Sequence, residues 1–280
     1  MASQKEKAQR FRALHERPGA FVIPNVWDGG SAALMQALGF EALATSSAAC
    51  AATLGKLDGE VTRDEALTHA ALIVSVSACP VAADLENGFG HAPETVADTI
   101  RFAAAAGLAG GSIEDASGDP AAPIYEFAHA VDRVTAAAAE ARRHHFVLTA
   151  RAENFLHDRP DLDDTVRRLQ AFERAGAQVL FAPGLPDLAA VRTVCRALKK
   201  PFNFMVGIRG KSFAVSDLAA AGVKRISLST SLYRAAMTGL LAAAREIKDL
   251  GTFGYLETLL RGDELAEHLK QQARARGSSG

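Results

Sequence analysis

Cysteines, aromatic side chains and long apolar runs are scarce in this sequence, and each scarcity argues against a class of protein. The three cysteines, Cys50, Cys79 and Cys195, form no CxxC pair, and an odd number gives no disulfide framework. Aromatic residues make up only 6% of the chain. No apolar run approaches the roughly 20 residues that a membrane-spanning helix needs. We therefore expect a reduced, cytoplasmic protein that does not use a membrane.

An excess of either charge is also missing. Lysine and arginine total 31 and aspartate and glutamate total 32, which gives a formal net charge of −1. A chain without an excess of basic residues is not expected to bind a nucleic acid backbone. The first 19 residues read as a charged helix and lack the apolar core of a signal peptide.

Short apolar runs alternate with longer amphipathic stretches along the whole chain. The runs are four to eight residues long and several are almost continuously apolar, which is typical of strands buried on both faces. The strands are expected at 21–26, 41–47, 79–86, 110–115, 146–153, 178–184, 202–207 and 225–230. The helices are expected at 28–38, 63–76, 93–106, 124–143, 161–175, 186–199, 215–221 and 231–249.

Eight successive strand–helix units predict the α/β class, and within it a closed (β/α)8 TIM barrel with extra N- and C-terminal helices. An open doubly wound sheet more often has five or six strands, and no GxGxxG fingerprint follows a strand here. The 280 residues also suit a barrel, which typically needs roughly 250. We expect the barrel to span 1–252 and a helical extension with a frayed polar tail, RARGSSG, to span 253–280.

In such a barrel the active site lies at the C-terminal ends of the strands. Carboxylates dominate the residues expected there: Asp58, Asp84, Glu86 and Glu114 follow three adjacent strands. Converging carboxylates repel one another unless a cation neutralises them or protons are shared. Because the expected ligands are oxygens alone, Mg²⁺ or Mn²⁺ is favoured over Zn²⁺. Alternatively, some of these carboxylates cap helices or form salt bridges.

Arg151 is the one cation expected at the end of an inner strand. A guanidinium that faces an acidic cluster suits a substrate carboxylate or phosphonate. The alternative is a structural role as counter-ion to Glu153 or Glu114. His91 is expected near the same face and His157 could reach it, but the sequence assigns neither a catalytic role. No GxSxG elbow supports a Ser-His-Asp triad.

Five segments, taken in order, resemble one family. They are PNVWDGGSA (24–32), TSSAACAATLGKLD (45–58), ADLENGFG (83–90), SIED (112–115) and TARAE (149–153). Together they are similar to the isocitrate lyase and phosphoenolpyruvate mutase superfamily, from about residue 10 to about residue 250. The resemblance implies a homo-oligomer, either a dimer or a tetramer, with C-terminal helices exchanged between subunits.

The resemblance also implies roles for single residues. The turn at Ser46, Ser47 and Ala48 would bind the carboxylate of a 2-oxo acid, with Trp27, Arg151 and Asn203 as further substrate-binding residues. Asp84 would be the direct Mg²⁺ (or Mn²⁺) ligand, with Asp58, Glu86 and Glu114 around it. Arg151, Glu114 and Glu153 are the expected catalytic residues. Glu86 departs from the family, which usually has aspartate at this position.

The largest departure lies after Asp115. The lyases of the family carry a KKCGH-like loop there, and the mutases carry a loop with lysine and asparagine. This chain reads ASGDPAAPIYEF (116–127), which contains no Cys, Lys or His. The strand at 178–184 also lacks the glutamate or histidine often found there. Tyr125, Glu153 and His91 remain as candidates for a general base.

Three functions are consistent with these residues. The first is a Mg²⁺-dependent carbon–carbon lyase or decarboxylase that acts on a small 2-oxo or 2-hydroxy di- or tricarboxylate through an enolate. The second is a phosphoenolpyruvate mutase-like enzyme that acts on a P–C bond. The third is a protein that binds a 2-oxo acid without turnover, which the sparse loop at 116–127 favours.

Overall fold

Eight parallel strands form the centre of the computed structural model, which describes residues 2–277 and, of these, the side chains of residues 2–270. The strands are β1 (Phe21–Ile23), β2 (Leu43–Ala44), β3 (Val81–Asp84), β4 (Gly110–Glu114), β5 (Val147–Arg151), β6 (Val179–Phe181), β7 (Phe202–Met205) and β8 (Arg225–Ser227). Neighbours in sequence are neighbours in the sheet, and β8 pairs with β1. The remaining edge is closed by hydrogen bonds from Val26 N to Ala44 O and from Ala44 N to Pro24 O. The predicted (β/α)8 barrel is confirmed.

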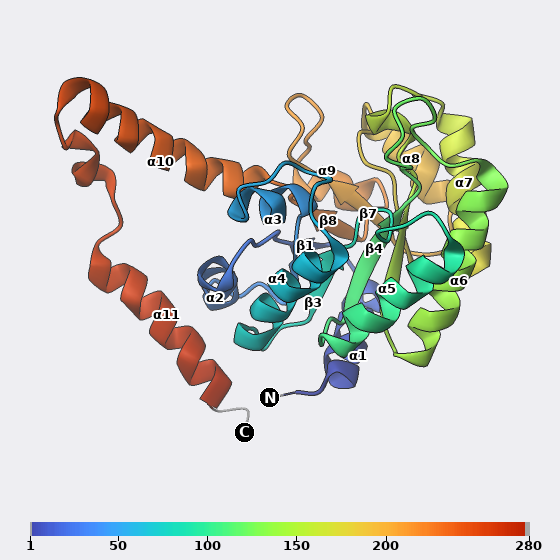
Figure 1. Ribbon diagram of the computed structural model, residues 1–280, viewed down its shortest axis with the longest axis horizontal. Helices are drawn as coiled ribbons and strands as arrows, with labels where there is room; N and C mark the ends of the chain where they lie inside the picture. Colours follow the sequence, from blue (N-terminus) through green and yellow to red (C-terminus); the bar gives the residue numbers. More distant parts are fainter. Residues whose placement is uncertain (1, 278–280) are drawn as a thin grey trace.

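Helices surround the barrel, as Figure 1 shows. They are α1 (Gln4–Glu16), α2 (Gly29–Ala37), α3 (Ser47–Thr53), α4 (Arg63–Val76), α5 (Pro93–Ala105), α6 (Phe127–Arg143), α7 (Leu162–Ala175), α8 (Leu188–Ala197), α9 (Val215–Ala220), α10 (Ser231–Leu250) and α11 (Gly262–Gly277). Two 3₁₀ turns, η1 (Asn154–Leu156) and η2 (Gly254–Thr258), complete the set. Eight of these helices overlap the eight predicted ranges. The short helix α3 lies between the second strand and α4 and is not among the predicted helices.

Helix starts follow local capping chemistry. Asp28 accepts from the backbone of Ser31, whose hydroxyl accepts from Asp28 N in return, so α2 begins with a reciprocal cap. Thr62 and Glu65 form the same arrangement at the start of α4. Such caps satisfy backbone N–H groups that the first turn leaves unpaired. They fix where each helix leaves the barrel, and hence the course of the loops before them.

A pair of glycines lets the strands approach closely at β4. A Cβ added at Gly110 would lie 2.6 Å from the carbonyl oxygen of Val147 on the adjacent strand. One added at Gly111 would lie 2.9 Å from both Leu85 and Phe146. Real Cβ atoms do not tolerate such contacts in a close-packed interior. The glycines therefore permit the packing that brings β3, β4 and β5 together below the site.

The N-terminal end of the barrel is covered by α1. Ala8, Phe11 and Leu14 form an apolar cluster with the first residues of several strands, including Phe21 and Val147. His15 is buried in the same layer, with Nδ1 2.8 Å from the carbonyl oxygen of Phe11 and Nε2 3.5 Å from Arg225. These partners suit a neutral imidazole that donates from Nδ1 and accepts at Nε2. Burial, aided by the charge of Arg225, lowers the pKa of His15 to about 3.

This buried histidine predicts a loss of stability in mild acid. Between pH 6.5 and about 3 the unfolded chain binds a proton that the folded chain excludes, so the free energy of unfolding falls as pH falls. From pH 6.5 to 4.5 the fall should be about 2–3 kcal/mol greater for the wild type than for His15→Gln, at 1.36 kcal/mol per pKa unit. Urea unfolding followed by circular dichroism measures both. Parallel pH profiles for the two proteins would contradict the prediction.

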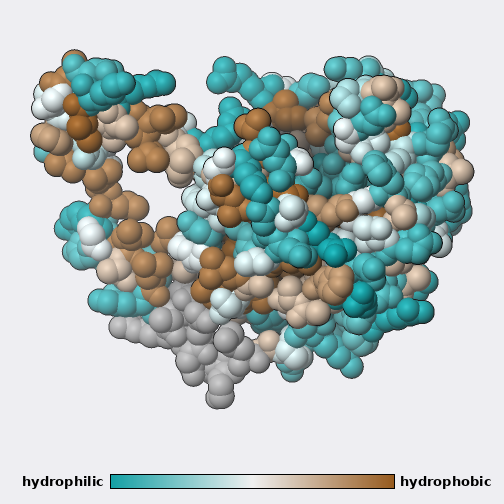
Figure 2. All heavy atoms as spheres, viewed as in Figure 1, coloured by the Kyte–Doolittle hydropathy of each residue, from teal (hydrophilic) through white to brown (hydrophobic). Residues whose placement is uncertain are grey.

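The last described helices form an arm that leaves the barrel. In Figure 1, α10 runs away from the barrel and α11 runs back, beside α2. No residue of α10 is buried, although Leu240, Leu241, Ile247 and Leu250 all lie on it. Phe253, Leu256, Leu259 and Leu260 beyond it are exposed too, and Figure 2 shows this apolar surface along the arm. We call residues 231–277 the C-terminal arm.

The predicted helices beyond residue 252 are present as η2 and α11. The boundary between a barrel and an extension at residues 252 and 253 stays a prediction. Of the tail expected to be frayed, 274–277 belong to α11, and 278–280 lie outside the described residues. Among the helices that the structure describes, none is both long and apolar enough to cross a bilayer.

Candidate active site

Three neighbouring strands end in charged residues that meet at one point. Asp84 is the last residue of β3, Glu114 of β4 and Arg151 of β5. Glu114 and Arg151 are paired across the two strands, and Asp84 is paired with Ser112. The parallel order therefore places all three side chains at the C-terminal edge of the barrel, as the sequence predicted.

Arg151 binds three carboxylates. Its Nη1 lies 2.9 Å from Asp84 Oδ1 and 3.0 Å from Glu114 Oε2, and its Nε lies 2.8 Å from Glu153 Oε1. The side chains of these four residues are at most 19% exposed. The alternative role of Arg151 as counter-ion of Glu114 and Glu153 is thus present in the structure, and its binding of a substrate carboxylate stays a prediction. Nη2 is the guanidinium nitrogen that these carboxylates leave for a ligand.

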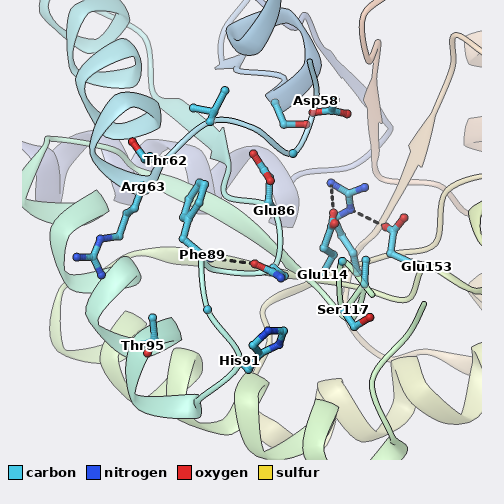
Figure 3. A pocket seen from close by; sticks show the side chains of 18 of the residues that line it. Asp58, Thr62, Arg63, Glu86, Phe89, His91, Thr95, Glu114, Ser117 and Glu153 are labelled. Atoms are coloured by element: carbon cyan, nitrogen blue, oxygen red, sulfur yellow. Dashed lines mark hydrogen bonds and ion pairs between the residues drawn. The ribbon is translucent and has the colours of Figure 1, made fainter. Parts of the chain in front are cut away.

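Two adjacent cavities share this arginine as a lining residue. The outer cavity has a volume of about 1040 Å³ and is lined by Glu86, His91, Glu114 and Glu153, among others. The inner cavity, of about 310 Å³, extends into the barrel and is lined by Asp84 and the turn Ser46, Ser47 and Ala48. Ser47, Asp58 and Arg151 border both. Figure 3 shows Asp58, Glu86 and Glu114 around the outer cavity.

The carboxylates of this site raise one another's pKa values. Burial, followed by the charges of Asp84 and Asp58, raises the pKa of Glu86 to about 7. Burial also raises the pKa of Asp58, although a hydrogen bond from Ser47 opposes the shift. The pKa of Glu114 is raised well above its usual value, because burial outweighs the attraction of Arg151. Burial first, and repulsion between the carboxylates second, therefore disfavour the ionised forms of Glu86 and Glu114 despite the nearby guanidinium.

Arg151 itself remains a cation. Burial disfavours its charge, but Glu114, Glu153 and Asp84 outweigh that cost and hold the pKa of Arg151 well above its usual value. The ring of Phe181 also lies under the guanidinium, with 5.1 Å between the guanidinium carbon and the ring centroid. A fixed cation at the border of both cavities can bind an anionic substrate group while the carboxylates share protons or a metal ion.

The turn after β2 is ordered by α3. Ser46 caps this short helix by accepting from Ala49 N at 3.5 Å, and Ser47 N points at Asp84 Oδ2 at 3.4 Å. Ala48 lines the inner cavity beside them. The structure therefore brings the predicted carboxylate-binding turn next to the predicted metal ligand. Trp27 is placed differently: it lines neither cavity, and its ring packs edge-on against Tyr233 at 5.5 Å.

A second arginine, which the sequence did not lead us to expect, lies inside the barrel. Arg225 borders the inner cavity and is only 6% exposed. Its Nε donates to Asn203 Oδ1 at 2.7 Å, and its Nη2 donates to Thr149 Oγ1 at 3.1 Å. Asn203 in turn donates to Ser227 Oγ at 3.0 Å. The alternation of Arg225 and Ser227 with the apolar Ile226 was the available signal that Arg225 faces inward.

The donor set fits a hard divalent cation. Within the part of the chain that the structure describes, no three His, Cys, Asp or Glu side chains are close enough together to form a ready-made metal cage. Mg²⁺, however, keeps several waters and is commonly held by only one or two carboxylates. Asp84 and Glu86, with Asp58 and Glu114 nearby, supply carboxylate oxygens, and the raised pKa values of Glu86 and Glu114 mean that their ionised forms lack sufficient stabilisation. The convergence of these carboxylates on one site is the observation that favours a cation here.

Known proteins match this chain over most of its length. A family model described as phosphoenolpyruvate phosphomutase matches residues 11–248. The chain belongs to the phosphoenolpyruvate phosphomutase family. The resemblance to the isocitrate lyase and phosphoenolpyruvate mutase superfamily is thereby confirmed, and the chain is an enzyme of this lyase and mutase type. The third candidate, a protein that binds a 2-oxo acid without turnover, is therefore not favoured.

Several relatives within the superfamily are enzymes of carbon–carbon chemistry. The 2-methylisocitrate lyase of Escherichia coli K12 is 29% identical over 270 residues, which cover 92% of this chain and 90% of the lyase. An oxaloacetate decarboxylase of Paraburkholderia xenovorans LB400 is 28% identical, with 95% and 86% covered. A crystal structure from Burkholderia cenocepacia J2315, of a protein with a proposed lyase or mutase activity, is 49% identical, with a TM-score of 0.92 and 94% and 95% covered.

The loop between β4 and α6 is where this phosphomutase family member is most distinctive. It is compact: Ser117 Oγ donates to Ala122 O at 2.6 Å, and Ala116 pairs with Ile124. Asp115, directly before it, accepts from Glu153 N at 2.8 Å and pairs with Arg168 at 3.0 Å. The loop closes on itself and offers the outer cavity Ala116, Ser117 and Gly118. Within 116–124 there is no Cys, Lys or His.

Proposed function

We propose that this enzyme is a Mg²⁺-dependent carbon–carbon lyase or decarboxylase for a small 2-oxo or 2-hydroxy di- or tricarboxylate, with an enolate intermediate. The observation that carries the proposal is the cluster of Asp84, Glu114 and Glu153 on the Arg151 guanidinium, at the border of two cavities. The similarity to a 2-methylisocitrate lyase and an oxaloacetate decarboxylase supports the same chemistry.

Each group has a separate task in this proposal. Arg151 Nη2 and the turn at Ser46, Ser47 and Ala48 bind the substrate carboxylate, and Asn203 contacts the substrate deeper in the inner cavity. Glu114 and Glu153 fix the guanidinium in place. A preorganised cation next to a site where negative charge develops lowers the barrier without reorganisation during the reaction.

A divalent metal would be held by Asp84, with Asp58, Glu86 and Glu114 around it. Members of the superfamily generally depend on such an ion. When bound, it would act as a Lewis acid that stabilises the enolate oxygen. Decarboxylation demands least of the chain, because carbon dioxide leaves without a general base. A reaction without a general base suits an enzyme whose loop 116–124 has no Cys, Lys or His.

The proposal is tested by supplying oxaloacetate, pyruvate and 2-oxoglutarate with and without Mg²⁺. Mg²⁺-dependent formation of pyruvate from oxaloacetate would support a decarboxylase. A second series with 2-methylisocitrate would test lyase activity by the same product. If phosphonopyruvate instead yields phosphoenolpyruvate in phosphorus NMR, the P–C alternative is right and the proposal is wrong.

Metal binding should release protons. Glu86 has a pKa of about 7 without a cation, so much of it is protonated at pH 6 and little at pH 8. A metal binds the ionised form, so the apparent affinity for Mg²⁺ should rise as pH rises through 7. Isothermal titration in two buffers of different ionisation enthalpy measures the released protons. Identical heats in both buffers, with an affinity independent of pH, would contradict the pKa shift.

We further propose that the protein is a homo-oligomer in which the C-terminal arm packs against another copy of the chain. The arm exposes a series of leucines while the barrel beside it is well packed. Exposed apolar surface of this extent usually marks a protein–protein contact. A second copy of the chain is the proposed occupant, because the apolar side chains of α10 and of the segment after it are exposed in the single chain.

The arm therefore predicts a dimer or tetramer in solution. Leu241→Glu should shift the molecular mass measured by multi-angle light scattering toward that of the monomer, because it places a charge on the apolar face of α10. Lys248→Glu on the same helix is the control and should leave the mass unchanged. A monomeric wild type at micromolar concentration would contradict the proposed contact.

A further inference from the structure

The outer cavity has an imidazole at its rim that the proposed function does not yet use. His91 follows the loop DLENGFG and is exposed, with its Nδ1 2.7 Å from the hydroxyl oxygen of Tyr125. The two rings also meet edge to face, 5.8 Å apart. In Figure 3 the His91 ring lies on the same side of the cavity as Ser117 of the compact loop. Tyr125 belongs to the segment between β4 and α6, so the pair lies close to residues 116–118, which border the outer cavity and include no Cys, Lys or His.

The backbone around His91 is held firmly from α6. Arg133 of that helix is 1% exposed, and its Nη1 donates to the carbonyl oxygens of Gly90 and His91 at 2.6 and 2.5 Å. Its Nη2 donates to Asn87 O, and its guanidinium stacks on the Tyr125 ring at 4.2 Å. His129 Nε2 lies 3.0 Å from the His91 carbonyl oxygen. Because the buried Arg133 guanidinium donates to the loop carbonyls and stacks on Tyr125, it holds both His91 and Tyr125 in position.

Two positive φ angles turn this segment back toward α6. Glu86 has φ 48° and Phe89 has φ 58°, a region that residues other than glycine seldom adopt. Strain of this kind persists only where the surrounding contacts determine it, and it is concentrated at functional sites. The same turn presents Glu86 and His91 to one cavity.

We propose that His91 is the proton-transfer residue of this cavity and that Tyr125 is its positioning residue. This inference rests on the proposed function. With Nδ1–H donating to the Tyr125 oxygen, Nε2 is left to accept or release a proton. The Asn87 side chain hydrogen-bonds the same hydroxyl, so the tyrosine is itself held in place.

The step is a simple proton transfer. After the carbon–carbon bond breaks, the enolate π electrons form a new C–H bond at C3 with the proton from His91 Nε2. The N–H bond breaks and the imidazole becomes neutral, and solvent water restores its proton because His91 is exposed. In reverse, Nε2 removes a methyl proton from bound pyruvate and leaves the enolate.

The reverse step gives a direct test: proton NMR of the pyruvate methyl group in heavy water with the full chain and Mg²⁺. The wild type should exchange these protons for deuterium. His91→Gln should slow the exchange by roughly 10²–10⁴-fold, the usual contribution of general acid–base catalysis, with pyruvate binding unchanged in calorimetry. Tyr125→Phe should slow it by a smaller factor at unchanged KM.

The matched control is His157→Gln, since His157 also lines the outer cavity on a different loop. The His157→Gln variant should exchange the pyruvate methyl protons at the wild-type rate. Wild-type exchange in His91→Gln, or loss of pyruvate binding in that variant, would overturn the assignment. If the wild type binds no pyruvate and exchanges none of its protons, the proposed function itself fails and the assignment fails with it.

Discussion

Replacing Arg151 by methionine should cost about 3–5 kcal/mol of folding free energy and abolish turnover. The guanidinium binds Asp84, Glu114 and Glu153 at 2.8–3.0 Å, and all four side chains are largely buried. Removing one partner of a buried ion pair leaves uncompensated charge, which is far more costly than the pair is beneficial. Urea unfolding and a substrate assay measure the two effects.

The loss of folding stability in Arg151→Met should depend on pH. Glu114 already has a raised pKa, so it can become neutral when its cation is lost. Protonation removes the unpaired charge, and the destabilisation by Arg151→Met should be smaller at pH 5.5 than at pH 8. If the methionine variant does not fold, Arg151→Lys keeps the charge but loses the Nε donor to Glu153 and the planar arrangement of donors, and it should fold with little activity.

Arg17 provides the matched control. It forms an ion pair with Glu41 at 2.6 Å, but the two side chains are 43% and 55% exposed. Exposed pairs contribute roughly 0–1 kcal/mol, so Arg17→Met should unfold almost like the wild type. Equal effects of the two substitutions would mean that Arg151 is not the counter-charge of a buried cluster.

Asp84→Asn should lower the Mg²⁺-dependent activity by at least roughly 100-fold while leaving the fold intact. The amide keeps the size of the side chain but loses the charge that a hard cation requires. It also relieves part of the negative charge around Glu86, whose raised pKa should fall toward its usual value. Electron paramagnetic resonance with Mn²⁺ counts the bound ions directly and needs no substrate.

The control for this substitution is Asp98→Asn on α5. Asp98 pairs with Arg101 at 2.7 Å on the surface and lies outside both cavities. It should retain Mn²⁺ binding and activity. If Asp84→Asn binds Mn²⁺ as tightly as the wild type, the ion is held elsewhere and the assignment of the ligands is wrong.

The positions of the strand-end residues could be predicted because they follow directly from the barrel topology. Once eight parallel strands close into a barrel, Asp84, Glu114 and Arg151 must share one edge, whatever the details of packing. Both the alternation of buried and exposed positions along a strand and the order of the strands can be recognised in a sequence. The approach of these side chains to within hydrogen-bonding distance follows from register, which the glycines of β4 help to set.

Other features depend on contacts between segments that lie far apart in the sequence. The alternation with Ile226 indicates that Arg225 faces inward, but its hydrogen bonds to Asn203 and Thr149 come from other strands. Helix α3 forms on a seven-residue segment that has no amphipathic period long enough to recognise. The link between His91 and Tyr125 spans 34 residues and needs the position of α6.

The central claim is that one divalent cation lies among the carboxylates of Asp58, Asp84, Glu86 and Glu114, opposite Arg151. Anomalous diffraction from crystals soaked in Mn²⁺ and pyruvate tests it most directly. We predict a single strong peak per chain, bonded to Asp84 and within reach of a ligand on Arg151. A peak away from these carboxylates, or none at this site, would contradict it.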